Sequence, residues 1–323
     1  MAFSRAVYRA DLRSLLPDDD TLERGLAAVF GASTRCERVA HIFASTFPAE
    51  ILRCTFADGR SAELLCKYSA GKRSDSGGHR GGVAYEAMVY RSLLDPLCLS
   101  TARYFGEHTE PGRGDHWLFV EYLGTAVRTD EAPDPEVALL AAARWAGEFH
   151  ARATPVAEAS VPRLSEYTAG YYAHWARRTR EFGAARADEF PWLAHVCLRF
   201  EEIAGSFAAP DAVIHGEYTP HNVLVDDGVI RPIDWESAAR ALGEIDVAGL
   251  LEGWPDDIAS ACVAEYRRVR WPGGAPLNAA DRLDFARVYW ALRWLGHSPR
   301  WREKKLAPRM AQLRASAERL GLI

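Results

Sequence analysis

The chain changes character near residue 135, and this change limits the folds open to it. Before it, short apolar runs alternate with turn signals: residues 51–56 and 62–68 flank Asp58 and Gly59, a strong hairpin signal. After it, long Ala-rich segments carry apolar residues at helical spacing. Strands followed by helices indicate an α+β fold with a β-rich N-terminal lobe and a mainly helical C-terminal lobe.

The N-terminal part reads as a small antiparallel sheet with one helix. A further strand is expected within residues 36–47, and residues 117–120 form another apolar run of strand type. Residues 71–82 form a loop rich in Gly, Ser and Arg. The helix that follows begins at Val83 and is expected to end near Asp95, because Pro96 disfavours helical backbone in the residue before it.

The C-terminal part reads as helices with one β-rich interruption at residues 213–233. The apolar periodicity predicts helices over residues 137–151, 164–180, 192–206, 257–269, 279–295 and 309–320. A chain of 323 residues has room for two lobes of ordinary size. We expect residues 1–121 to form the first lobe and residues 122–323 the second.

Composition excludes several classes of function. Hydrophobic residues make up 48% of the chain and charged residues 26%, which is typical of a globular protein. The formal net charge of −5 gives no electrostatic case for binding nucleic acid. No run reaches the roughly 18 apolar residues of a membrane span. The charged N-terminus lacks the apolar core of a signal peptide, so a cytoplasmic location is expected.

The six cysteines are scattered and form no Cys-x-x-Cys pair. Zinc sites usually contain such pairs, so a zinc site is not expected. Isolated cysteines in apolar stretches usually behave as small buried hydrophobes. We therefore expect reduced thiols.

The β-rich interruption carries the polar residues that suggest chemistry. Residues 223–225 and 229–233 flank a turn at residues 226–228, so they are expected to form a hairpin. Such a hairpin would place Glu217, Asn222 and Asp234 near one end. Two carboxylates and an amide form a hard oxygen site, and Mg²⁺ typically takes a few such ligands together with substrate phosphates and water.

This segment resembles the aminoglycoside phosphotransferase family, whose choline kinase-like members share the protein-kinase-like fold. The family pattern His-Gly-Asp, four residues, then Asn is matched by residues 215–222, and Ile-Asp-Trp/Phe-Glu is matched by residues 233–236. The resemblance implies that Glu217 is the catalytic base and that Asn222 and Asp234 are catalytic metal ligands. It also implies Mg²⁺ as cofactor and ATP or GTP as donor.

The resemblance extends to the N-terminal lobe. Lys67 matches the lysine that contacts the α- and β-phosphates, and Glu86 matches the glutamate that pairs with it. Glu121 and Leu123 match the segment whose backbone receives the nucleotide base. Ser45 matches the hydroxyl-bearing hairpin that covers the phosphates in place of a Gly-rich loop. In residues 243–248, Asp246 matches an aspartate that braces the catalytic loop.

One position departs from the family pattern, because Glu217 stands where Asp is usual. The carboxylate is kept but its side chain is one methylene longer, so the acceptor hydroxyl must sit differently. The expected function is transfer of the γ-phosphate to a hydroxyl of a small molecule, such as an aminoglycoside or other antibiotic, a sugar or an amino alcohol.

Three other functions stay open. Glu217 also fits a nucleotide-binding pseudokinase or sensor. A kinase acting on a peptide side chain fits less well, because the Gly-rich loop of protein kinases is missing. A metal-dependent hydrolase would leave Lys67 and Glu86 unexplained.

Overall fold

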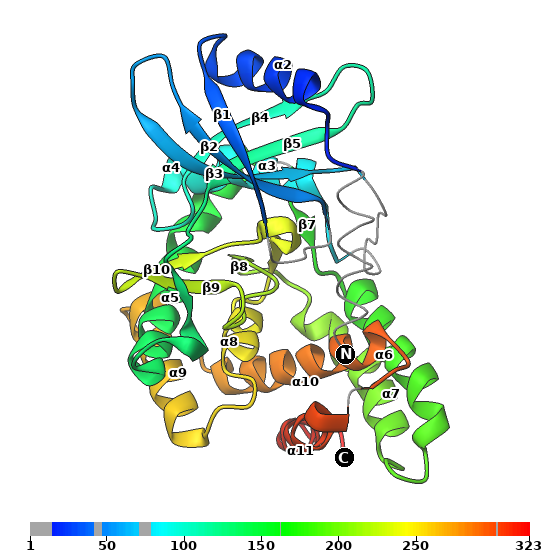
Figure 1. Ribbon diagram of the computed structural model, residues 1–323. Coiled ribbons are helices and arrows are strands. Elements are labelled where there is room, and N and C mark those ends of the chain that lie inside the picture. Colours follow the sequence, from blue (N-terminus) through cyan, green and yellow to red (C-terminus); the bar gives the residue numbers. More distant parts are fainter. Residues whose placement is uncertain (1–14, 42–46, 71–78, 162, 302) are drawn as a thin grey trace. The chain divides into compact units, whose positions relative to one another are not determined.

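A computed structural model describes residues 15–41, 47–70, 79–161, 163–301 and 303–323 (Figure 1). Its contacts divide the chain into two compact units. The N-terminal unit runs to Ala126 and also contains Asp234–Ser237, whereas the C-terminal unit contains Val127–Ile233 and Ala238–Ile323. The assignment of nucleotide binding to residues 1–121 and acceptor binding to residues 122–323 stays a prediction.

The N-terminal unit is built on one antiparallel sheet. Its five strands lie in the order β1-β2-β3-β5-β4. Their bounds are β1 Arg35–Ala40, β2 Ala49–Thr55, β3 Ser61–Tyr68, β4 Tyr104–Thr109 and β5 His116–Glu121. Strand β3 pairs with β2 on one side and β5 on the other, so it lies inside the sheet.

Helices accompany this sheet. Helix α2 (Asp19–Phe30) packs Leu22 and Leu26 onto a core that includes Trp117 of β5. Helix α3 (Val83–Val89) contacts β5 and continues through a π-helical turn (Tyr90–Leu94) into α4 (Asp95–Leu97). The short helix η5 (Trp235–Ser237) contacts α3.

The expectation that the helix ends near Asp95 is confirmed, since α4 ends at Leu97 and Cys98 takes a left-handed conformation. One expectation for this unit needs correction. Strand β4 was not predicted. Its register shifts between Tyr104 and Gly106, and this irregularity hides the alternating pattern.

The cysteines also need correction. Cys36 and Cys54 are register partners on β1 and β2 and form a disulfide. The other four cysteines are free. The spacing of the cysteines along the sequence does not reveal this disulfide, because Cys36 and Cys54 become neighbours only when β1 and β2 pair.

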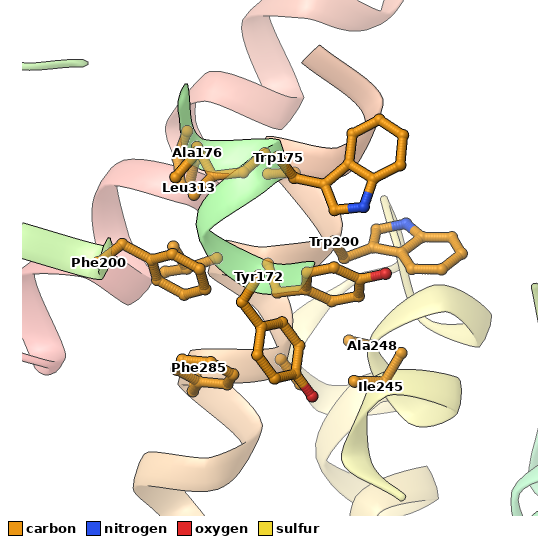
Figure 2. Packing of buried hydrophobic residues seen from close by; sticks show 14 of the residues in the cluster. Tyr172, Trp175, Ala176, Phe200, Ile245, Ala248, Phe285, Trp290 and Leu313 are labelled. Atoms are coloured by element: carbon orange, nitrogen blue, oxygen red, sulfur yellow. The ribbon is translucent and has the colours of Figure 1, made fainter. Parts of the chain in front are cut away.

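The C-terminal unit is mainly helical, as predicted. Its larger helices are α5 Pro135–Ser160, α6 Ala169–Gly183, α7 Leu193–Ile203, α8 Glu244–Leu250, α9 Asp256–Arg270, α10 Ala279–His297 and α11 Glu303–Arg319. Helix α5 packs against α9, and α10 packs against α6, α8 and α11. Figure 2 shows the resulting core, where side chains such as Tyr172, Phe285 and Trp290 meet.

Short strands complete this unit. One sheet has the order β10-β9-β6 and the other β7-β11-β8. The strands are β6 Val127–Arg128, β7 Ser165–Glu166, β8 Ala212–Ile214, β9 Val223–Asp226, β10 Val229–Pro232 and β11 Ala239–Ala241. Single-turn helices lie at Thr129–Glu131, Ala184–Arg186 and Ala204–Phe207.

The predicted hairpin is confirmed, since β9 and β10 pair around a turn in which Asp227 and Gly228 have φ values of 48° and 78°. Two predicted helix starts are wrong. Residues 165–166 form β7 rather than helix, and α11 begins before Pro308 instead of after it. No helix in the described part of the chain has the length and apolar character needed to cross a membrane.

Candidate active site

Lys67 of β3 is buried with two carboxylates in the N-terminal unit. Its Nζ donates to both carboxylate oxygens of Glu86 at 2.9 Å and to Oδ1 of Asp234 at 2.8 Å. Lys67 is 8% exposed and Glu86 is 2% exposed. The predicted pair of Lys67 and Glu86 is therefore present, and Asp234 joins it.

The surroundings keep the Lys67 ammonium charged. Burial by itself lowers the pKa of Lys67, but the charges of Asp234 and Glu86 outweigh it and hold that pKa above its ordinary value. A buried cation held by two carboxylates is suited to binding phosphate oxygens, because it stays positive and its position is fixed.

Asp234 enters this cluster through an unusual backbone conformation. Its φ is 69°, in the left-handed region that residues with a side chain seldom adopt. The next residue, Trp235, is fully buried, and its N–H donates to Oε1 of Glu86 at 3.2 Å. Strained backbone held by such contacts is common at functional sites.

Glu236 lies in the same turn and does not join the Lys67 contacts. Its Oε1 lies 3.3 Å from Nη1 of Arg80, and its backbone carbonyl accepts from the Gly81 N–H. Burial, with help from the charge of Asp234, raises the pKa of Glu236 to about 8. These contacts give Glu236 a role in holding the turn.

In the C-terminal unit, Asp246 at the start of α8 braces the loop that follows β8. Its two carboxylate oxygens accept from the backbone N–H groups of His215 at 2.7 Å and Gly216 at 2.9 Å. Gly216 has φ 82°, a conformation that glycine adopts readily. The structural role predicted for Asp246 fits these contacts.

His215 holds the same loop through both nitrogens of its ring. Its Nδ1 accepts from the Glu217 N–H at 3.3 Å, so the ring proton is on Nε2, which donates to the Ile233 carbonyl at 2.9 Å. The ring therefore joins the loop to the end of the β9–β10 hairpin.

Asn222 and Glu217 are brought together on this loop. Nδ2 of Asn222 donates to the Glu217 carbonyl at 3.1 Å, which leaves its side-chain oxygen as the group able to bind a cation. The Asn222 carbonyl accepts from the Ile233 N–H at 2.9 Å, and Asp234 is the next residue along the chain. Amide and carboxylate oxygens suit Mg²⁺, so these residues fit the predicted ion.

Sequence reasoning missed the partner of Glu217. Nη2 of Arg293, on α10, donates to Oε1 of Glu217, and the two residues are 4% and 5% exposed. A signal was available: Arg293 lies between Trp290 and Trp294 on a helix that is otherwise largely apolar. A charge in such a helix needs a partner.

The residues predicted to bind the base stay untested. Glu121 ends β5, where its N–H donates to the Arg103 carbonyl at 2.8 Å, and the Leu123 carbonyl accepts from the Ala126 N–H. Ser45 lies outside the described residues.

The comparisons with known proteins agree with this geometry. The model of the family described as "Phosphotransferase enzyme family" matches residues 89–279. No curated protein matched the chain in a sequence search. Many solved structures do match.

Three of these structures illustrate the match. An aminoglycoside-3'-phosphotransferase of type VIII is 20% identical, with 86% of this chain and 98% of that chain covered and a TM-score of 0.52. Choline kinase LicA from Streptococcus pneumoniae is 12% identical, with 94% and 99% covered and a TM-score of 0.59. Amicoumacin kinase hAmiN, in complex with AMP-PNP, Ca²⁺ and Ami, is 12% identical, with 96% and 95% covered and a TM-score of 0.58. At these identities the likeness establishes the protein-kinase-like fold of small-molecule kinases.

Proposed function

The chain belongs to the phosphotransferase enzyme family, whose model matches more than half of its length, and we propose that it transfers the γ-phosphate of ATP or GTP to a hydroxyl of a small molecule. The observation that carries this proposal is the contact of the buried Lys67 with Glu86 and Asp234. Kinases use such a lysine–glutamate pair and a metal-binding aspartate to hold the phosphates.

Each residue of the site then has a role. Lys67 would bind phosphate oxygens, and Glu86 would hold Lys67 in place. Asn222 and Asp234 would hold Mg²⁺, which neutralises charge that develops on the phosphates. The carboxylate of Glu217 would accept a hydrogen bond from the acceptor hydroxyl and orient it for attack.

Little covalent chemistry is asked of these side chains. Phosphoryl transfer depends mainly on positioning and on stabilising charge. The contacts of Asp246 with the backbone of His215 and Gly216 fix the loop that carries Glu217, and so contribute to positioning.

The acceptor is proposed only as a class. The names of the structural neighbours refer to an aminoglycoside phosphotransferase, a choline kinase and a glucosamine kinase. A spectinomycin phosphotransferase is described in complex with ADP and spectinomycin. These acceptors share two properties: they are small molecules and they carry a hydroxyl group.

The test is release of ADP or GDP with Mg²⁺ across a panel of aminoglycosides, peptide antibiotics, sugars, amino alcohols and hydroxy amino acids. The D234N variant is the blank, because it keeps the shape of Asp234 but loses the charge of a metal ligand. Release that depends on one acceptor class and vanishes in D234N supports the proposal. Release that is unchanged in D234N contradicts it.

A second function is nucleotide binding without transfer, and one observation favours it. Glu217 is buried and its carboxylate is already paired with Arg293. Isothermal titration with ATP and Mg²⁺ separates the two functions. Metal-dependent binding together with no transfer to any acceptor in the panel would favour a sensor over an enzyme.

A further inference from the structure

Arg293 is a buried cation beside the proposed catalytic carboxylate. It lies on α10, inside the C-terminal unit, and is 4% exposed. Its guanidinium carbon lies 5.4 Å from the ring centre of Trp290 and 5.1 Å from that of Trp294. Aromatic faces and one carboxylate therefore stabilise its charge where water has little access.

The pair with Glu217 uses only part of the guanidinium. Nη2 donates to Oε1 of Glu217. Within the described residues, the buried Nε and Nη1 of Arg293 have no hydrogen-bond partner. Buried donors without a partner are costly, and an arginine carries five N–H groups directed outward in one plane. Arg293 therefore keeps hydrogen-bonding capacity close to Glu217 that the described residues do not use.

Three other arginines of the same unit differ in this respect. A cavity of about 460 Å³ is lined by Arg287, Arg309 and Arg319. Each of these three forms an ion pair with a carboxylate, either Asp284 or Glu252. Their donors do not appear among the buried unpaired atoms, whereas two donors of Arg293 do.

We propose that Arg293 is a specificity-determining residue, and that its open donors bind an anionic oxygen, such as a carboxylate or phosphate ester, next to the reacting hydroxyl of the acceptor. The inference rests on the proposed function, since it takes Glu217 as the residue that meets this hydroxyl. An ammonium group at the same place would lie close to a fixed positive charge that is largely shielded from solvent. Acceptors with an amine beside the hydroxyl should therefore bind less well.

Arg293 also has a positioning role in this proposal. The side chain of Glu217 has one more rotatable bond than the aspartate usual in the family, and the bond from Nη2 restrains it. The charge of Arg293 persists in this place: burial lowers its pKa, but Glu217 together with the nearby tyrosines Tyr289, Tyr171 and Tyr167 keeps that pKa above its ordinary value.

Three sugars that differ mainly in charge test the proposal: glucuronate, glucose and glucosamine. Dissociation constants are measured by isothermal titration with ATP analogue and Mg²⁺ present. The expected order of affinity is glucuronate, then glucose, then glucosamine. A charge-assisted hydrogen bond corresponds to roughly a 10- to 100-fold change in affinity. R293Q should lose roughly that factor for glucuronate and little for glucose.

The matched control is R314Q, which removes one arginine from the exposed face of α11 and should leave the order unchanged. R293K guards against misfolding of R293Q, because it keeps the charge but has no planar set of donors, and it should retain part of the preference. Binding of glucuronate no tighter than that of glucosamine, including no measurable binding of either, overturns the proposal. A preference that survives in folded R293Q overturns it as well.

Binding and release of ADP or GDP, measured on the same samples, distinguish a failure of the anion site from a failure of phosphotransfer. Selective binding of glucuronate that depends on Arg293, without release of ADP or GDP for any acceptor, would contradict phosphotransfer and leave the anion site standing. Acceptor-dependent release with glucosamine binding tightest would support phosphotransfer and remove the anion site.

Discussion

At the scale of single residues, the site depends on charges that are buried together. Lys67 and Glu86 form one such group, which the partly exposed Asp234 joins, and Glu217 with Arg293 forms another. A buried charge that loses its partner is strongly destabilising, whereas an exposed pair contributes little. Substitutions in these groups should therefore affect stability as well as function.

The first prediction concerns Lys67. K67M leaves Glu86 buried without its cation, so the free energy of unfolding should fall by about 3–5 kcal/mol, measured by urea denaturation. The double variant K67M/E86L should recover part of this loss, because apolar side chains then replace both charges.

The control for Lys67 is R53A. Arg53 pairs with Glu63 across β2 and β3, but both side chains are largely exposed, so R53A should change stability much less. Equal losses in K67M and R53A would contradict the view that burial makes the Lys67 pair important.

The second prediction concerns His150 of α5, which supports the brace formed by Asp246. Its Nε2 lies 3.1 Å from Oδ2 of Asp246 and its Nδ1 lies 3.0 Å from the hydroxyl of Tyr266. Burial lowers the pKa of His150 below its ordinary value of 6.5, with Asp246 opposing this shift. In the folded state the ring is therefore neutral near neutral pH.

This shift has a definite sign for stability. As the pH falls below about 6.5, the unfolded chain binds a proton at His150 that the folded chain excludes, so the free energy of unfolding falls. H150Q cannot take up this proton. Urea denaturation between about pH 7.5 and pH 5 should show wild type losing up to about 1 kcal/mol per pH unit relative to H150Q. A constant difference between the two proteins would contradict the prediction.

At the scale of elements, close packing places the strands and helices that carry these residues. Strand β3 holds Lys67 inside the sheet between β2 and β5, and helix α2 packs onto the same sheet. Gly25 is where α2 meets Trp117 of β5, and a Cβ atom built there would lie 2.1 Å from the indole ring. This contact is possible only because the residue has no side chain.

The third prediction follows from this contact. G25A should gain at most about 1 kcal/mol in helix propensity but lose about 1–3 kcal/mol from overpacking against a buried ring, so the net effect is a loss of stability. Thermal denaturation measures it. The control is G205A, in a short helical segment where a Cβ atom would meet nothing within 4 Å. Destabilisation by G205A equal to that by G25A would rule out packing as the cause.

At the scale of the whole molecule, the proposed roles are divided between two compact units. Lys67, Glu86 and Asp234 belong to the N-terminal unit, whereas Glu217, Asn222 and Arg293 belong to the C-terminal unit. A nucleotide that binds the folded protein would stabilise it against unfolding. Ligand binding to the folded state alone adds about 2.7 kcal/mol when the ligand is present at about 100 times its dissociation constant.

The fourth prediction uses this linkage. ATP with Mg²⁺ should raise the melting temperature of the whole protein, whereas either one alone should raise it much less. Both D234N and N222A should reduce the shift, because each removes a proposed metal ligand. Binding that stabilises the protein equally in the presence of a chelator would contradict a metal-dependent site.

The sequence by itself determined the family and the α+β fold, and it predicted the main site residues. This was possible because residues 213–236 keep their motif within one stretch of chain, where spacing in the sequence fixes spacing along a loop and hairpin. The pair of Lys67 and Glu86 was also predicted, since a lysine in an apolar strand and a glutamate on the following helix each need a partner.

Only the tertiary structure decided three features: the disulfide of Cys36 with Cys54, the place of Asp234–Ser237 in the N-terminal unit, and the pair of Glu217 with Arg293. Glu217 and Arg293 are far apart in the sequence, and so are Lys67 and Asp234. Which charges meet depends on how helices and strands pack, and packing is a property of the whole core. A sequence pattern shows that a buried charge needs a partner, and the fold supplies the partner.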